Sequence, residues 1–189
     1  DNTQGNLNDE QVRFAKTIYS AGNDLLQLIN DILDISKVEA GKLDLVPEDV
    51  PLRRTIDGLA MVFEPLAMQK KLAFRVDIDQ SVPGTLLTDR QRMEQILKNL
   101  LSNAIKFTDA GEVTLKVTGA PDGAVRFVVT DSGIGIAPDQ HDRIFDAFHQ
   151  ADGTTSRRFG GTGLGLSISR DLTSLLGGTL EVSSTPGAG

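Results

Sequence analysis

Within its 189 residues the chain has the balance of a soluble globular protein, with 39% hydrophobic and 24% charged residues. Its formal net charge of −7 argues against a nucleic-acid surface, because binding a phosphate backbone requires a basic face. The absence of cysteine excludes disulfides and thiolate metal sites, and no apolar run approaches the ~18 residues of a membrane span, so we expect a cytoplasmic segment without membrane insertion.

The first expected element is one long helix from Asn8 to about Ala40. Its apolar residues recur at intervals of seven, as at Ile18, Leu25 and Ile32, and form a stripe wider than a two-stranded seam. Gly41 ends the pattern. The stripe either packs on the domain that follows, or pairs with a second copy or with a partner helix outside the chain. We favour pairing.

Helices and strands alternate along the rest of the chain. We expect strands over 42–50, Leu72–Asp79, Glu112–Thr118, Ala124–Asp131 and Thr179–Ser183, and helices over Leu52–Lys70, Asp89–Phe107, Pro138–Phe148 and Gly163–Leu176. Pro47 and Pro51 put the first strand at a sheet edge. The pattern predicts an α+β fold: a two-layer α/β sandwich whose mixed, mostly antiparallel sheet is covered by helices.

The expected helix Asp89–Phe107 carries a polar flank. Asn99, Asn103 and Lys106 are spaced four and three apart, which places them on one side of a helix. An amide oxygen is a hard neutral ligand suited to Mg²⁺, and a nearby ammonium can hold a phosphate. The alternative interpretation is a solvated helix face.

The sequence "DSGIGI", Asp131 to Ile136, follows the expected strand Ala124–Asp131. A carboxylate at this rim accepts hydrogen bonds only, so it would select an exocyclic amine such as that of adenine. Gly133 and Gly135 would let another group approach the backbone. The alternative is an ordinary Asp-Ser-Gly turn.

Four glycines lie within six residues in the stretch "GGTGLG", residues 160–165. One interpretation is a flexible turn before a helix. The other is a loop whose N–H groups close over phosphates at a helix N-terminus. This stretch alone does not decide between them.

In order and spacing, "NLLSNAIKFT", "DSGIGI", "FDAFHQAD" and "GGTGLGL" resemble the N, G1, F and G2 boxes of sensor histidine kinases. That family belongs to the superfamily of DNA gyrases, mismatch-repair ATPases and heat-shock chaperones. The stretch 7–45 resembles the second helix of the kinase dimerisation domain and its joint to the catalytic domain. The resemblance therefore implies two parts: residues 1–41, the second helix of a phosphoacceptor hairpin whose first helix is absent, and residues 42–189, a Bergerat-type ATP-binding domain.

The resemblance also implies roles for individual residues toward ATP (or ADP) and Mg²⁺. Asn103 would hold Mg²⁺ with Asn99 assisting, Lys106 would lie near the phosphates, and Phe107 would flank the nucleotide. Asp131 would accept from the adenine amine in a pocket shaped by Gly133, Ile134, Gly135 and Ile136. The triphosphate would be covered by Gly161, Thr162, Gly163, Leu164, Gly165 and Leu166. Thr179 would reach adenine through water, and Phe145 and Phe148 would anchor the lid. Arg157 and Arg158 have two interpretations. They are a solvated basic pair, or one of them, taken as Arg158, lies near the γ-phosphate.

One position separates kinases from ATPases in this superfamily. The gyrase and chaperone branch has a water-activating glutamate where this chain has Asn99, and an amide cannot act as a general base. The resemblance thus implies a histidine kinase of the hybrid type in a two-component phosphorelay. Two alternatives stay open: a degenerate nucleotide-binding signalling module, and a serine kinase or ATPase of the anti-sigma-factor type.

The expected partners follow from the missing acceptor. His141 and His149 lack the acidic residue and Thr-Pro pair that follow the family's acceptor histidine, so we interpret both as ordinary surface or lid residues. The fragment alone is therefore not expected to phosphorylate itself. The resemblance implies an acceptor histidine on the protein's own dimerisation domain, a receiver domain or response regulator downstream, and a homodimer in the intact protein. Whether that protein has a membrane anchor stays open.

Overall fold

The structure is a computed structural model that describes residues 5–120, 122–149 and 162–189. It divides into two compact units, Asp1–Leu43 and Asp44–Gly189. The first contains the helix α1 (Asp9–Glu39), as predicted. A capping box begins it: the Asn8 side chain accepts from the Gln11 N–H at 2.8 Å, and the Gln11 side chain accepts from the Asn8 N–H at 3.0 Å.

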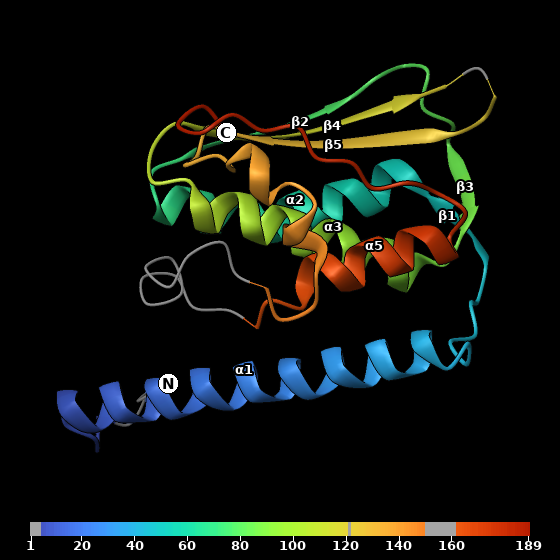
Figure 1. Cartoon of the computed structure of the whole chain (residues 1–189). Helices are drawn as coiled ribbons and strands as arrows, with labels where there is room; N and C mark the ends of the chain where they lie inside the picture. The colour runs from blue at the N-terminus through green and yellow to red at the C-terminus, as the bar shows by residue number, and fades with distance from the viewer. Residues whose placement is uncertain (1–4, 121, 150–161) are drawn as a thin grey trace. The chain divides into compact units, whose positions relative to one another are not determined.

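The second unit consists of a helical layer and a mixed sheet. Its elements are β1 (Glu48–Pro51), α2 (Leu52–Gln69), β2 (Ala73–Ile78), β3 (Thr85–Thr88), α3 (Arg90–Phe107), β4 (Glu112–Gly119), β5 (Val125–Asp131), the 3₁₀ helices η1 (Pro138–Gln140) and η2 (Arg143–Phe145), and α5 (Gly165–Leu175). In the larger sheet β2 runs parallel to β4, and β4 antiparallel to β5; β1 and β3 form a separate antiparallel pair. Figure 1 shows α2, α3 and α5 on one side of the larger sheet. This arrangement confirms the predicted α+β class.

The core lies between that sheet and the helices. Val113, Leu115 and Val117 alternate along β4 and are fully buried, which is the period of a strand with one covered face. From the helical layer Leu97 and Leu101 of α3 pack into the same cluster. Burial of this stripe fixes the rotation of α3 about its axis, and with it the direction of its polar flank.

Two predicted elements are wrong. The helix expected over Pro138–Phe148 is instead the pair η1 and η2. It cannot continue because Asp146 is extended and Phe148 has a φ of 64°, which is not a helical conformation. The strand expected over Thr179–Ser183 is absent from the described part of the chain, since this stretch alternates in hydrophobicity but forms no ladder with a neighbouring strand.

The first expected strand is also shorter than predicted. Residues 42–47 are irregular and only Glu48–Pro51 is extended and paired. Its partner β3 was not predicted, because four residues without alternating hydrophobicity give little signal. Pro51 opposes Thr85 in this two-stranded sheet. A proline is compatible with such a position because each strand has an unpaired edge.

Candidate functional site

The polar flank of α3 is organised around Asn99. Its side-chain N–H donates to the Ser169 hydroxyl of α5 at 2.8 Å, and its Oδ1 accepts from the Asn103 amide at 3.4 Å. Asn99 and Asn103 are both half-buried, and one helical turn separates them. The amide of Asn99 therefore ties α3 to α5 and orients Asn103.

Asn103 has the property expected of a neutral metal ligand. Its side-chain NH₂ group donates to Asn99 Oδ1, while no donor among residues 5–120, 122–149 and 162–189 reaches its own Oδ1. Nor do these residues include a group of three or more His, Asp or Glu side chains that could hold a metal ion. A magnesium ion would fit here through the amide oxygen and oxygens of a bound phosphate, the kind of partly protein-bound site that Mg²⁺ favours.

Lys106 follows Asn103 on the same flank. Its ammonium lies 4.8 Å from the ring centroid of Phe107, and burial lowers the pKa of Lys106 below the ordinary lysine value. A partly desolvated cation loses hydration that an anionic ligand can replace. The position therefore suits a phosphate group.

The 131–136 loop is attached to the end of α3. Asp131 ends β5 and is half-buried, and its Oδ1 accepts from the Gly133 N–H at 2.8 Å. The Ile134 N–H donates to the Phe107 carbonyl at 3.3 Å. No donor among the described residues reaches Asp131 Oδ2, so this oxygen can accept from an amine.

Two glycines of the stretch 160–165 occupy positions that favour glycine, one because of its backbone angle and one because of the space around it. Gly163 has a φ of 72° and its carbonyl accepts from the Phe148 N–H at 3.0 Å. Gly165 begins α5 directly against Asn99, and a Cβ there would collide with the Asn99 side chain. The glycines thus serve close approach between elements at the site.

The structure brings most predicted site residues to one region. The predicted α3 residues are Asn99, Asn103, Lys106 and Phe107. The contacts above join this helix to Gly165 and to the segment from Asp131 to Ile134, and Gly163 lies two residues before Gly165. Thr162 accepts from the Leu164 N–H at 3.2 Å, Leu164 is buried, and Leu166 is half-buried on the first turn of α5.

Three other predicted residues, Gly135, Ile136 and Thr179, have no described hydrogen bond to α3. Gly135 and Ile136 contact the C-terminal segment instead of α3: the Ile136 N–H donates to Ser184, and Gly135 lies against Thr185. Thr179 is exposed on an irregular stretch, and no described hydrogen bond joins it to the site. Arg158 and Gly161, together with Arg157, lie outside the described residues.

The predicted lid anchors also differ from one another. Phe145 is buried and stacks beneath Arg170, whose guanidinium lies 5.5 Å from the ring centroid. Phe148 is 67% exposed, so it is not a core aromatic residue. Its backbone is nevertheless held by Gly163.

Ser169 and Thr108 are site residues that sequence reasoning missed. Ser169 lies one helical turn after Gly165 and receives the Asn99 bond. The Thr108 hydroxyl donates to the Ala104 carbonyl at 2.7 Å and lies 3.4 Å from Asp131 Oδ1. Thr108 is the last residue of the motif NLLSNAIKFT, but its role in the site depends on a contact with Asp131, which is 23 positions away.

Both histidines have local partners. His141 Nε2 lies 3.2 Å from the Ile136 carbonyl, and His149 Nε2 lies 2.9 Å from the Gln140 side-chain oxygen. Each is half-buried. These contacts fit ordinary structural residues.

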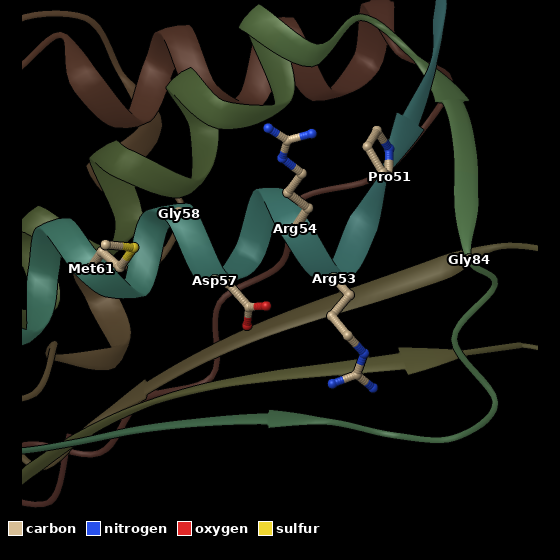
Figure 2. Close-up of a pocket in the computed structure, with 7 residues that line it drawn as sticks. All are labelled: Pro51, Arg53, Arg54, Asp57, Gly58, Met61 and Gly84. Carbon is tan, nitrogen blue, oxygen red and sulfur yellow. The ribbon is translucent and has the colours of Figure 1, made fainter.

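A pocket of about 580 Å³ lies away from the predicted site, at the N-terminal end of α2. Figure 2 shows Arg53, Arg54 and Asp57 on the first turns of α2, beside Pro51 of β1 and Gly84 before β3. No residue of the predicted set lines it.

Comparisons with known proteins agree with this geometry. The family model "Histidine kinase-, DNA gyrase B-, and HSP90-like ATPase" matches residues 88–189, and the model "His Kinase A (phospho-acceptor) domain" matches residues 1–41. The chain is 46% identical over 175 residues to the virulence sensor protein BvgS of Bordetella bronchiseptica, which covers 90% of this chain and 14% of that protein. It is 40% identical over 177 residues to the signal transduction histidine-protein kinase BarA of Escherichia coli, covering 92% and 19%.

Solved structures give the same result. Full-length ShkA in complex with AMPPNP has a TM-score of 0.82 at 35% identity, covering 96% of this chain and 37% of that one. The Acinetobacter baumannii histidine kinase AdeS has a TM-score of 0.77 at 26% identity, covering 97% and 83%. The chain spans 10–25% of the length of the curated relatives it matches. In the described part of the chain no helix is both long and apolar enough to cross a membrane.

Proposed function

Because the chain belongs to the histidine kinase-, DNA gyrase B- and HSP90-like ATPase family, in the form found in hybrid sensor histidine kinases, we propose that it binds ATP and Mg²⁺ on the polar flank of α3 and transfers the γ-phosphoryl group to a histidine. Residues 42–189 are the ATP-binding catalytic domain, and residues 1–41 are the second helix of the phosphoacceptor hairpin.

The observation that carries this proposal is the state of Asn99. Its amide donates to Ser169 and accepts from Asn103, and through these two bonds it holds the site together. An amide cannot take a proton from water as a general base. The chemistry therefore depends on a nucleophile that arrives from outside the site, which is sufficient because phosphoryl transfer relies mainly on positioning and charge stabilisation.

Each side chain then has a defined task. Asn103 Oδ1 binds Mg²⁺, which when bound neutralises charge on the phosphates. The Lys106 ammonium holds a phosphate oxygen, and Asp131 Oδ2 accepts from the exocyclic amine of adenine. Phe107 and the exposed side chain of Ile134 flank the nucleotide, while the backbone around Gly163 approaches the phosphates.

The acceptor and the partners belong to the intact protein. The acceptor histidine lies on the other helix of the dimerisation hairpin, and an aspartate of a receiver domain takes the phosphoryl group next. The exposed stripe of α1, which includes Ile18 and Tyr19, pairs with that helix and with a second subunit. The catalytic domain lies in the cytoplasm.

A transfer experiment tests the proposal. The chain is mixed with a separate acceptor-helix fragment and γ-labelled ATP, and the labelled product is treated with acid. We expect acid-labile label on the fragment's histidine, dependent on Mg²⁺. Acid-stable label on serine would support a serine kinase, release of phosphate alone an ATPase, and nucleotide binding without metal dependence a degenerate binding module; each of these contradicts the proposal.

A further inference from the structure

The last turn of α3 leaves carbonyl groups without helical partners, as every helix C-terminus does. Two of these groups are satisfied from nearby: the Ala104 carbonyl accepts from the Thr108 hydroxyl, and the Phe107 carbonyl accepts from the Ile134 N–H. The second bond also links α3 directly to the 131–136 loop. The geometry of this turn therefore sets how the two halves of the site face each other.

A single side chain from another helix satisfies the remaining carbonyls. The Lys70 ammonium donates to the carbonyls of Ile105 at 2.8 Å, Lys106 at 3.0 Å and Thr108 at 3.1 Å. An ammonium has three N–H donors, and here all three converge on one turn. Its charge also opposes the negative end of the α3 dipole.

We propose that Lys70, the C-cap residue of α2, is a positioning residue for the nucleotide site, and this inference rests on the function proposed above. It binds the backbone of the turn that carries Asn103, Lys106 and Phe107, and it contacts none of the predicted ligand side chains through a described bond. By holding three carbonyls from the α2 side, Lys70 keeps Phe107 in place to accept from Ile134.

The adjacent residue provides a matched control. Lys71 has the same charge, is exposed, and has no described side-chain hydrogen bond. The substitutions K70M and K71M remove one positive charge each at neighbouring positions and keep an unbranched side chain. A difference between them therefore measures the three hydrogen bonds of Lys70 and not the loss of charge near the site.

Two measurements on the whole chain test the role. The first is amide hydrogen exchange of Ile134 without nucleotide, relative to exchange of Leu115 in the core strand β4. The second is the affinity for Mg²⁺ and the ATP analogue AMPPNP. We expect K70M to accelerate Ile134 exchange relative to Leu115 and to weaken binding by about tenfold, the factor that corresponds to one hydrogen bond to a charged group. K71M should match the unsubstituted chain in both measurements. K70R should retain part of the Ile134 protection and part of the nucleotide affinity that K70M loses.

Several outcomes would overturn the inference. Equal behaviour of K70M and K71M in both measurements removes the special role of Lys70. Parallel acceleration of Ile134 and Leu115 shows a general loss of stability instead of a local one, and the milder K70Q would be used in the same way if K70M did not fold. If the unsubstituted chain binds no nucleotide, the proposed function fails, and the exchange ratio alone then decides whether Lys70 holds the turn.

Discussion

The helices α1 and α3 both carry an apolar stripe, yet only the stripe of α3 is covered. Leu97 and Leu101 of α3 are 2% and 0% exposed, whereas Ile18 and Tyr19 of α1 are 73% and 74% exposed. In the second unit the sheet and α2 supply the cover for α3. An amphipathic pattern therefore predicts a helix and its apolar face, but not the partner that buries the face; for α3 that partner lies within its own unit.

Truncating a buried leucine of α3 and an exposed leucine of α1 tests that difference directly, and it has the largest expected effect. Leu101→Ala should lower the free energy of unfolding of the second unit by about 2–5 kcal/mol, because it removes a fully buried side chain and leaves a cavity. Leu26→Ala on the exposed stripe of α1 should change it by less than about 0.5 kcal/mol. Urea unfolding followed at the methyl signals of Leu115 measures both. Equal effects of the two substitutions would contradict the comparison.

The next test separates the two faces of α3. Asn103→Ala should abolish the Mg²⁺-dependent part of ATP affinity, at least about tenfold or 1.4 kcal/mol, while unfolding stays close to that of the unsubstituted chain. The reason is that the substitution removes the free amide oxygen and leaves the apolar face intact. ATP titration with and without Mg²⁺ is the measurement. Undiminished metal dependence would refute the role of Asn103.

A third test compares how the two helices begin. The Asp89 carboxylate is buried; it accepts from the Arg92 N–H of α3 and from the Val46 N–H, both at 3.0 Å. Asp89→Ala should destabilise the second unit by about 1–2 kcal/mol through loss of the N-cap. The exposed cap of α1 provides the control: Asn8→Ala should leave the unfolding of the second unit unchanged. A cost of Asp89→Ala no larger than that of Asn8→Ala would show that the cap is dispensable.

The smallest expected effect concerns the solvent side of α3. Glu94 forms ion pairs at 2.8 Å with Lys98 and Arg90, and these bonds, first that to Lys98, hold the pKa of Glu94 below its ordinary value of 4.5. Glu94→Gln should cost only about 0.5 kcal/mol, because exposed pairs are weak. The stabilisation is complete above the unfolded pKa and is lost as the pH falls through the lower folded pKa. The urea midpoints of the unsubstituted chain and of Glu94→Gln should therefore converge in acid. A difference that stays constant with pH would show that it does not come from the ion pairs of Glu94.

Local pattern predicted most of the fold. The bounds of α2, β2, α3, β4 and β5 are close to those expected, because each combines a clear period with a cap, a turn or a proline at its end. Two of the failures have a common cause. The stretch Thr179–Ser183 has a strand pattern without a partner, and β3 has a partner without a pattern, so in both cases long-range pairing decided the structure.

The candidate site was predictable only as far as local motifs reach. The amides of α3, the carboxylate after β5 and the glycines before α5 could each be found from residue type and spacing. Their supports could not be found, because Ser169 reaches Asn99 over 70 positions and Lys70 reaches Thr108 over 38. Such contacts carry no periodic signal in the sequence.

In the proposed site one nucleotide contacts α3, the 131–136 loop and the start of α5. An amide NMR titration of the unsubstituted chain with AMPPNP and Mg²⁺ tests it most directly. We predict that the signals of Asn103, Gly133 and Gly165 shift together with a single dissociation constant, while those of Arg54 and Asp57 at the pocket of Figure 2 stay unchanged. Shifts with separate dissociation constants, or shifts confined to one of the three segments, would show that no single nucleotide contacts all three.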